Sequence, residues 1–365
     1  MRLLLGGDVN INREVPATAL RPVAAVLAEA DVRFVNLEGP LSEPSPYPSR
    51  PDIAHKPRWR HSPPRMVDGL VAAGIDVVSC ANNVTYPPAA ALASSDVLDS
   101  HGIAHCGAGI DRAAARTPAI VQRAGVRVGF LACTSIFFPY GHAAGDHTPG
   151  VATAWAETSY RPDPRIAEVP GRPPVVRTVA DPDDLAALRD DVRRLRDQVD
   201  VVVVSMHWGV PGDGVCDYQR QFAYAAIDAG AHIIAGHGTH DVHGIEFHRS
   251  RPILYGLGNL VFDWPTMRGR GGGMLATVDV AQRRLTLHLV SATDEHGSIR
   301  LLAPADVGAA VAGRVTRLSA ALGTTVLSYV THLDVAWPDP GRCDDAQADP
   351  APHPRLEAGG SAGNR

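Results

Sequence analysis

The sequence predicts an α/β protein built on a largely parallel β-sheet, and two observations carry this prediction. Near-continuous apolar runs of strand length alternate with longer segments of helical pattern, which is typical of parallel strands that helices cover on both faces. The apolar runs also end at polar or glycine-containing turns, where open α/β sheets bind their ligands. The chain has 365 residues, of which 45% are hydrophobic and 20% charged, so it is long enough for a full globular core.

The predicted elements follow one another in a regular order. Six apolar strands are expected at Arg2–Leu5, Val32–Asn36, Val77–Ala81, Val126–Cys133, Val201–Met206 and His232–Ala235. Helical patterns lie between them at Ala17–Ala30, Pro64–Ala73, Ala89–His101, Pro182–Gln198 and Tyr218–Ala229. The later stretches Ile253–Leu257, Val261–Phe262, Met274–Val280 and Arg284–Val290 predict successive antiparallel strands of a second sheet. A helix at Ala305–Leu322 and a strand at Thr325–Val330 complete the order.

One large domain is expected over residues 1–335. Within it, residues 138–181 are rich in Pro, Gly and His and lack a clear period, which indicates a long loop or lid. Residues 336–365 are rich in Pro, Asp, Gly and Ala and are expected to form a disordered tail.

Composition excludes several classes of protein. The net charge of -5 provides no basic surface for nucleic acid and no polybasic patch for a membrane. The five cysteines are scattered without a CxxC pair, which favours a reduced cytoplasmic setting over a disulfide framework or a thiolate zinc site. The first residues are expected to form a short buried strand, too short for a signal peptide or a membrane anchor. The oligomeric state stays open.

Five short polar segments follow predicted strands and supply carboxylate, amide and imidazole groups. They are Gly7-Asp8-Val9-Asn10, Asn36-Leu37-Glu38-Gly39, Ala81-Asn82-Asn83, Met206-His207-Trp208-Gly209 and Gly236-His237-Gly238-Thr239-His240. Groups of these kinds hold divalent metal ions. Taken singly, each segment has an ordinary alternative, because an Asp or Asn beside glycine often only forms a turn or caps a helix.

The histidines of these segments give the strongest indication of a metal centre. His207 directly follows a strand that begins with four valines, and His237 and His240 lie in a glycine-rich turn that lets the backbone bend so that imidazoles face one point. Neutral imidazole is the commonest nitrogen ligand of zinc, iron and manganese. One such histidine is more often a packed core residue, but three of them together with Asp8 and Glu38 favour a metal site.

Other residues are candidates for binding substrate or supporting the ligands. Lys56 and Arg60 lie in a proline-rich stretch and are expected to clamp a carboxylate or phosphate, with a solvated charged face as the alternative. The remaining candidates for substrate contact are Asn10, His142 and His147. The residues expected to orient the ligands from behind are Asn82, Asn259 and Asp263.

The polar segments, in this order, resemble the bacterial CapA/PgsA family of capsule and poly-γ-glutamate synthesis proteins. Further matching stretches are Gly107-Ala108-Gly109, Val128-Gly129-Phe130-Leu131, Ile227-Asp228-Ala229-Gly230-Ala231 and Tyr255-Gly256-Leu257-Gly258-Asn259. The resemblance runs from about Arg2 to Asp263 and implies a calcineurin-like metallophosphatase sandwich, with two mixed β-sheets flanked by helices in one large domain. It also implies that the metal ligands are Asp8, Glu38, Asn83, His207, His237 and His240. Such a donor set suits manganese, iron or zinc and does not exclude calcium or magnesium.

The chain departs from the family at the position of a proton donor. The family usually has Ala-Asn-Asn-His with an Asp three residues further on, and Val84 and Pro87 occupy those two places here. In related phosphatases this His protonates the leaving group, and general acid catalysis typically contributes about 10²–10⁴ in rate. Ordinary phosphomonoesterase activity is therefore not expected.

Three functions remain open. The first is a metal-dependent enzyme of epimerase or hydrolase type, acting on a peptide or γ-glutamyl-type substrate as in natural-product biosynthesis, with His207, His237, His240 and Asp241 as proton carriers. The second is a non-catalytic accessory protein of poly-γ-glutamate or capsule synthesis. The third is a phosphoesterase in which His240 or a loop histidine replaces the lost acid.

Overall fold

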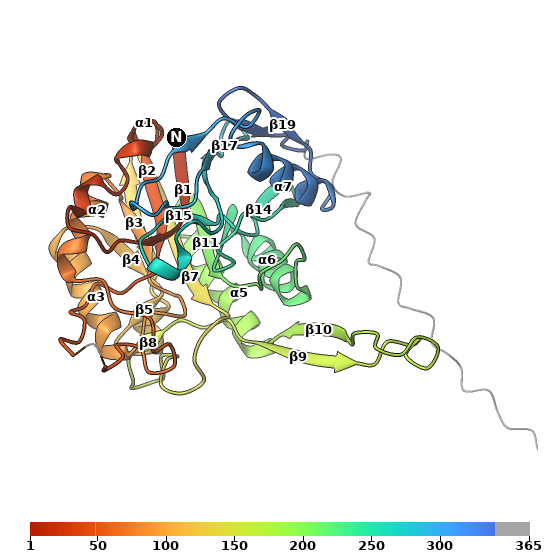
Figure 1. Cartoon of the computed structure of the whole chain (residues 1–365), viewed down its shortest axis with the longest axis horizontal. Coiled ribbons are helices and arrows are strands. Elements are labelled where there is room, and N and C mark those ends of the chain that lie inside the picture. The colour runs from red at the N-terminus through yellow and green to blue at the C-terminus, as the bar shows by residue number, and fades with distance from the viewer. Residues whose placement is uncertain (48, 340–365) are drawn as a thin grey trace, which may run out of the picture.

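Two mixed β-sheets pack face to face in the computed structural model, which describes residues 1–47 and 49–339 (Figure 1). Helices cover the outer face of each sheet, so the layers follow the order helix, sheet, sheet, helix. The aromatic rings of Phe34 and Phe130 stack at 5.1 Å across the space between the sheets. The mixed α/β class and the pair of mixed sheets flanked by helices are thus as expected.

The first sheet holds the N-terminal strands. Its order is β19-β20-β17-β16-β1-β2-β3-β4, with β15 also on β1 and β18 on β17. Strands β1 to β4 are parallel, whereas β16 and β17 run antiparallel to their neighbours. The bounds are β1 Arg2–Asn10, β2 Val32–Leu37, β3 Val77–Ser79, β4 Ala104–Cys106, β15 Asn259–Phe262, β16 Gly273–Asp279, β17 Arg284–Val290, β18 Leu301–Leu302, β19 Val326–Ser328 and β20 Leu333–Val335.

The second sheet has the order β13-β14-β12-β11-β7-β6. Its inner strands are parallel, and the edge strands β6 and β13 are antiparallel to their neighbours. The bounds are β6 Ala119–Arg123, β7 Val126–Thr134, β11 Val201–His207, β12 Ile233–His237, β13 Ile245–His248 and β14 Arg251–Leu254. The parallel strands β11 and β12 consist largely of Val, Ile and Ala, and all their residues are buried, because both faces of the sheet are covered.

Each sheet has its own helices. The outer face of the first sheet packs against α1 (Ala24–Ala28), α2 (Val67–Ala72) and α3 (Pro88–Ser100). The outer face of the second sheet packs against α5 (Pro182–Arg196) and α6 (Asp217–Ala229), while α7 (Ala309–Ala320) contributes Ala312 and Val315 to the core between the sheets. No helix in the described part of the chain is long and apolar enough to cross a membrane.

Three expectations about these elements were wrong. The six N-terminal strands do not form one sheet, because β1 to β3 and β7, β11 and β12 lie in different sheets. Strands β14 and β15 are not successive antiparallel neighbours of β16, since β14 pairs in parallel with β12 and β15 pairs in parallel with β1. An apolar run identifies a strand but not its partner, which the packing of the two sheets decides.

The third wrong expectation concerns the helix at Ala17–Ala30. It is broken into 3₁₀ turns at Pro16–Thr18 and Arg21–Val23, followed by the short helix α1. Pro22 is the physical reason, because proline has no backbone N–H to continue an α-helix and its ring clashes with the preceding turn.

The stretch at 138–181 contains regular structure. Gly150–Val151 (β8) pairs with Ala108–Gly109 (β5), and β9 (Ala156–Arg161) pairs with β10 (Val175–Ala180) in a hairpin that projects from the body (Figure 1). A lid function for it stays a prediction. Of the expected tail, residues 336–339 are described, and the Trp337 indole donates to the Ser250 carbonyl over 2.8 Å. The rest of that prediction, 340–365, lies outside the described residues.

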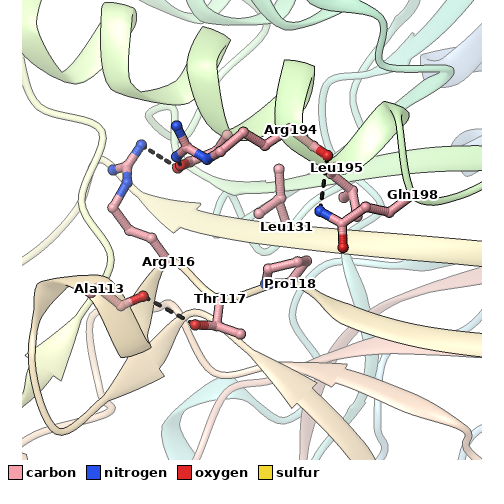
Figure 2. A pocket seen from close by; sticks show the side chains of 9 residues that line it. Ala113, Arg116, Thr117, Pro118, Leu131, Arg194, Leu195 and Gln198 are labelled. Atoms are coloured by element: carbon pink, nitrogen blue, oxygen red, sulfur yellow. Dashed lines mark hydrogen bonds and ion pairs between the residues drawn. The ribbon is translucent and has the colours of Figure 1, made fainter.

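A cavity of about 250 Å³ lies between the four-residue helix α4 (Arg112–Ala115) and α5 (Figure 2). Arg116 and Arg194 both pair there with the buried carboxylate of Asp191, and the Arg116 contact measures 2.6 Å. This cavity is lined by residues of α4 and α5, by the segment 116–118 and by Leu131 of β7, and it does not include any of the predicted site residues.

Candidate metal centre

The carboxyl ends of strands from both sheets meet at one point. Asp8 lies on β1, and Glu38 directly follows the neighbouring parallel strand β2. On the facing sheet, His207 and His237 are paired residues at the ends of β11 and β12, and His240 lies three residues beyond β12. Two carboxylates of one sheet therefore face three imidazoles of the other.

A glycine makes the close approach of the second sheet possible. Gly238 has a φ of +92°, a conformation that other residues rarely adopt. A Cβ atom at this position would lie 2.8 Å from Nε2 of His207. The turn can therefore carry His237 and His240 past His207 only because residue 238 has no side chain.

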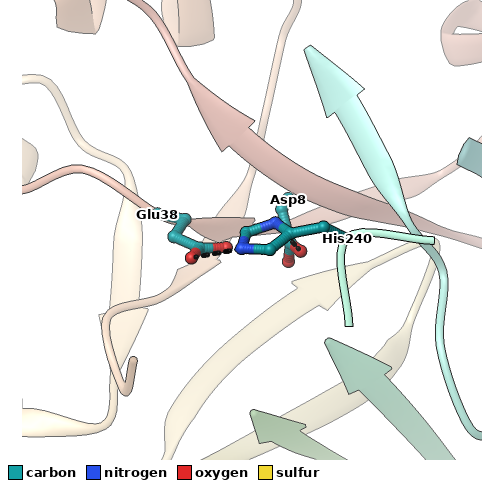
Figure 3. A group of neighbouring side chains, drawn as sticks. All are labelled: Asp8, Glu38 and His240. Atoms are coloured by element: carbon teal, nitrogen blue, oxygen red, sulfur yellow. Dashed lines mark ion pairs between the residues drawn. The ribbon is translucent and has the colours of Figure 1, made fainter. Parts of the chain in front are cut away.

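Asp8, Glu38 and His240 offer ligand atoms that all lie within 4.8 Å of one another (Figure 3). The imidazole of His240 lies between the two carboxylates, with Nε2 3.5 Å from Glu38 Oε1 and Nδ1 3.7 Å from Asp8 Oδ2. His237 Nδ1 is 3.4 Å from Asp8 Oδ1, and His207 Nε2 is 3.8 Å from Glu38 Oε1. The structure thus brings five of the six predicted ligands together.

Hydrogen bonds determine which imidazole nitrogens face the carboxylates as lone pairs. His240 Nδ1 lies 3.0 Å from Asn259 Oδ1, which can only accept, so in the neutral ring Nδ1 carries the proton and the lone pair of Nε2 faces Glu38. The Thr134 hydroxyl donates to the Ile136 carbonyl over 2.8 Å and lies 3.2 Å from His207 Nδ1. With its proton used there, Thr134 accepts from His207, whose bare Nε2 also faces Glu38.

Several buried polar atoms at this point have no hydrogen-bond partner among the described residues. Both carboxylate oxygens of Glu38 are among them, although the side chain is fully buried. The others near these ligands are Asn10 Oδ1, His207 Nε2, His237 Nδ1 and His237 Nε2. Asn83 Oδ1 also has no partner among the described residues, and its role as the sixth ligand stays a prediction. A buried carboxylate without a partner is costly, and two lone pairs directed at it repel. A divalent cation among these atoms would resolve both problems, so the donor set fits a metal ion.

The charges of the centre shift its ionisation. Burial by itself would raise the pKa of the Asp8 carboxyl, but the contact with His237 and the nearby His240 and His207 outweigh burial and lower it. Burial by itself would lower the pKa of His240, but Glu38, Asp8 and the Asn259 hydrogen bond raise it. The Asp8 carboxylate therefore stays ionised, as a metal ligand must be.

Amide side chains hold the carboxylate side of the centre in place. Asn36 Nδ2 donates to Asp8 Oδ1 over 2.9 Å, and Asn10 Nδ2 donates to the Glu38 carbonyl over 2.8 Å. Asn82 donates to the Leu37 carbonyl and accepts the backbone N–H groups of Val84 and Thr85. Asn82 and Asn259 therefore lie where residues that orient the ligands were expected. Val84 is fully buried, and its apolar side chain offers no proton.

Four of the proposed site residues hold other partners or face solvent. Asp241 accepts the backbone N–H of Val242 and pairs with Arg314 at 3.5 Å, so its carboxylate is engaged away from the imidazoles. The carboxylate of Asp263 is bound by the Arg13 guanidinium rather than by a histidine. The Arg60 guanidinium pairs with Asp52 at 2.8 Å and supports its own loop, so it is not free to clamp a substrate. His147 is exposed.

Two predicted substrate residues have informative surroundings. Lys56 Nζ lies 5.0 Å over the Trp59 ring, which stacks on Trp264 at 5.6 Å. Burial lowers the pKa of Lys56 although the nearby Glu38 charge raises it, so the ammonium lies within electrostatic reach of the centre. His142 is buried, and its ring accepts the backbone N–H of Phe138 over 3.1 Å.

Sequence reasoning missed three contributors to the centre. Thr134 is the last residue of β7, just as His207 is the last residue of β11. A polar residue at the end of an apolar strand could therefore have identified Thr134. Asn36 belongs to the polar segment Asn36-Leu37-Glu38-Gly39, but its role as a hydrogen-bond donor to Asp8 was not predicted. Phe262 lies 5.3 Å from the His240 ring, and an aromatic residue in an apolar strand gives no signal of such a role.

Comparison with known proteins places these residues in a family. The model of the Bacterial capsule synthesis protein PGA_cap family matches residues 2–264. An uncharacterized protein of Sinorhizobium fredii is 29% identical over 300 residues, which cover 70% of this chain and 65% of that protein. A probable polyglutamine synthesis accessory protein of Mycobacterium tuberculosis is 31% identical over 251 residues, which cover 66% of this chain and 57% of the relative.

Shorter and weaker similarities accompany these. The PGA biosynthesis protein CapA of Bacillus subtilis is 39% identical over 97 residues, which are 26% of this chain and 25% of that protein. A hypothetical protein of known crystal structure from Thermus thermophilus superposes over 83% of this chain and 98% of that one, with a TM-score of 0.39 at 14% identity. This TM-score is too low to inform the fold. The chain spans 65% and 57% of the first two relatives. The match over residues 2–264 confirms the expected family: the chain belongs to the bacterial capsule synthesis protein (PGA_cap) family.

Proposed function

We propose that this chain is a metal-dependent enzyme, with a calcineurin-like metallophosphatase arrangement of its sheets, that acts on a peptide or γ-glutamyl-type substrate. The observation that carries the proposal is the fully buried Glu38 carboxylate, which lacks a hydrogen-bond partner among the described residues while Nε2 of His207 and Nε2 of His240 face it. Asp8, Glu38 and His240 would hold one ion. The side chains available for a second ion or for the rest of the shell are His207, His237, Asn83 and Asn10. Manganese, iron or zinc suits such a mixed donor set.

The chemistry divides between the ion and the chain. A bound divalent ion supplies Lewis-acid polarisation of a substrate carbonyl, which acidifies the adjacent Cα–H. The chain keeps His240 oriented through Asn259, keeps Asp8 oriented through Asn36, and excludes water from behind the ligands, since Asp8, Glu38 and His237 are buried. The imidazoles would be the groups of this centre that accept or return the proton.

The surroundings of the missing proton donor favour this function over a phosphoesterase. Val84 occupies the place of the family histidine and is apolar and buried. His142, a candidate substitute, lies against the same turn, where burial and then the charge of His55 lower its pKa to about 4. His142 is therefore neutral at pH 7 and would be a poor donor to a leaving group.

The rim of the centre suits a substrate that carries a carboxylate. Lys56 lies on Trp59, whose ring meets the Phe262 ring edge-on at 5.8 Å, and Phe262 in turn contacts His240. This series of contacts leads from an ammonium group to the metal ligands along an apolar wall. A γ-glutamyl or peptide carboxylate would pair with Lys56 while an amide carbonyl reaches the ion.

Metal content is the first test. The chain is purified without a chelator or histidine tag as wild type, as His237→Ala and as the control His288→Ala, whose half-buried imidazole lies outside the centre. One or two equivalents of metal in wild type and control, with a loss in His237→Ala, would support the centre. A wild type that binds no metal after soaking with manganese, zinc and iron would contradict it.

A second measurement separates the enzyme from the alternative of a non-catalytic accessory protein, which the lost proton donor and the printed name of the Mycobacterium tuberculosis relative favour. Metal-loaded protein is incubated with γ-glutamyl peptides in deuterated water, and products are read by mass spectrometry. Incorporation of deuterium at Cα without cleavage indicates epimerisation, and new termini indicate hydrolysis. Peptide binding without either reaction would favour the accessory role.

A further inference from the structure

The hairpin formed by β9 and β10 has an edge that no described residue covers. The two strands pair only with each other in the described part of the chain and project from the body of the molecule (Figure 1). Residues 157–161 of β9 are all exposed. Tyr160 and Val176, which are paired across the hairpin, are 69% and 55% exposed. An isolated two-stranded ribbon is only marginally stable in water, so a further strand would stabilise it.

The open edge belongs to β9. Helix α6 covers the base of β10, where the Ala180 N–H donates to the Gln221 side chain over 2.7 Å and the Tyr218 N–H donates to the Thr178 hydroxyl over 3.3 Å. No described strand pairs with the other side of β9. An exposed strand edge of this kind is a template for pairing with another strand.

The hydrogen-bond pattern of the hairpin shows which residues of β9 direct their backbone groups away from β10. The Asp181 N–H donates to the Trp155 carbonyl over 2.8 Å, at the base of the hairpin. Hydrogen-bonded and non-hydrogen-bonded residue pairs alternate along two antiparallel strands. Glu157, Ser159 and Arg161 therefore direct their backbone groups at β10. Thr158 and Tyr160 therefore offer their N–H and C=O groups to a strand on the open side.

We propose that β9 pairs with β9 of a second copy of this chain, antiparallel about a two-fold axis at Ser159. This register places Glu157 opposite Arg161 of the second copy, and the symmetry makes the pair twice. It also places Thr158 opposite Tyr160 of the second copy, so that the outward backbone groups of both strands bond to each other. The two hairpins then form one four-stranded sheet.

Charge selects this register over its neighbours. An axis moved to Thr158 places Glu157 opposite Ser159, without a cation. An axis moved to Tyr160 places Glu157 opposite Asp163, which is repulsive. Of these three registers, only the axis at Ser159 gives both charged side chains of β9 an opposite charge, and the occupant that fits the edge is therefore a second copy of the chain.

A charge exchange tests the pairing. The mass of the full chain is measured by sedimentation over a range of concentrations for wild type, Glu157→Arg, Arg161→Glu and the double variant. We expect a wild-type dimer, a dissociation constant raised about tenfold or more in each single variant, and recovery in the double variant, where the exchanged charges again face each other. Circular dichroism checks that each variant is folded. A wild type that stays monomeric at every concentration, or single variants that dimerise as well as wild type, would overturn the proposal.

A disulfide tests the register independently of charge. Residues that face each other in a non-hydrogen-bonded antiparallel pair have Cα atoms about 4.5 Å apart, within the range that a disulfide spans. Ser159→Cys should therefore form a covalent dimer under mild oxidation with oxidised glutathione. Thr158→Cys, which faces Tyr160, and the wild type are the matched controls. Equal cross-linking of both cysteine variants, or none in Ser159→Cys, would show that the two-fold axis does not lie at Ser159.

Discussion

Asn259 accepts a hydrogen bond from Nδ1 of His240 over 3.0 Å, and this contact leaves Nε2 of His240 directed at the Glu38 carboxylate. Asn259 is also the residue of β15 that pairs with Asp8 of β1. Asn259 thus connects His240, which follows a strand of the second sheet, with β1 of the first sheet, which carries Asp8. The orientation of the His240 ring is therefore tied to the backbone pairing of the first sheet.

Replacing this amide should weaken metal binding without unfolding the chain. In Asn259→Ala the His240 ring loses the partner that fixes its tautomer, and loss of such a support typically lowers metal affinity about 10- to 100-fold. Isothermal titration of metal-free protein with manganese or zinc measures the effect. Asn259→Asp, which keeps an acceptor, should retain most of the affinity. Equal affinities for Asn259→Ala and wild type would show that Asn259 does not orient the ligand.

Removing the Glu38 charge should have opposite effects with and without metal. At a pH that keeps His240 neutral, the buried carboxylate has no hydrogen-bond partner among the described residues, so Glu38→Gln should stabilise the metal-free protein by about 1–3 kcal/mol. The same variant should lose most of the gain in melting temperature that added metal gives the wild type. Urea unfolding with chelator and thermal unfolding with metal measure the two effects. A metal-free Glu38→Gln that is less stable than wild type would contradict the cation-site interpretation.

The buried ion pair beside α5 should be costly to break on one side only. Asp191 is 7% exposed and pairs with both Arg116 and Arg194, so Asp191→Ala leaves two guanidinium groups without their carboxylate. We expect a loss of about 3 kcal/mol in the free energy of unfolding. The double variant Asp191→Leu, Arg116→Met should recover part of this loss, because no buried charge remains unpaired. Urea denaturation checks both, and metal content should stay unchanged.

Stability should fall with pH below neutrality, and His232 should account for part of the fall. Burial and then the charge of Arg251 lower the pKa of His232 from 6.5 to about 4, and its Nδ1 accepts the Val202 N–H over 3.1 Å. The unfolded chain binds a proton between pH 6.5 and 4 that the folded chain does not. This contribution is therefore complete above the unfolded pKa of 6.5 and is lost as the pH falls toward 4. It amounts to at most about 3 kcal/mol, at about 1.4 kcal/mol for each pH unit.

The variant His232→Asn isolates this effect, since asparagine keeps an acceptor for Val202 and does not titrate. The free energy of unfolding, measured in urea at several pH values from acidic to neutral, should depend less steeply on pH in the variant than in wild type. Identical slopes would assign the pH dependence to other groups.

The local elements were predictable because their signals are local. The run Val201–Val204 identified β11, and the amphipathic pattern from Pro182 identified α5, whose N-terminus the Asp181 side chain caps. The division of strands between two sheets was not predictable, because β1 and β11 carry the same apolar pattern. Which strands pair depends on contacts such as Phe34 with Phe130, and these residues are far apart in the sequence.

The candidate centre was predictable to the extent that polar residues interrupt apolar strands. Asp8, His207 and His237 stand out at strand ends for this reason. The pairing of Arg60 and Asp263 was not predictable, because their partners, Asp52 and Arg13, are ordinary charged residues whose proximity no pattern reveals. A charged side chain is available to a ligand only if no neighbour neutralises it, and that requires the folded structure.

The division of the ligands between the two sheets has a consequence for synthesis of the protein. The carboxylates lie within the first 38 residues, whereas the last imidazole follows at position 240. A nascent chain that ends before His240 cannot assemble the group of Asp8, Glu38 and His240, however well its first strands have formed. The group can therefore come together only after β11, β12 and His240 have left the ribosome, and metal binding, if the proposal holds, would distinguish a chain that includes His240 from one truncated before it.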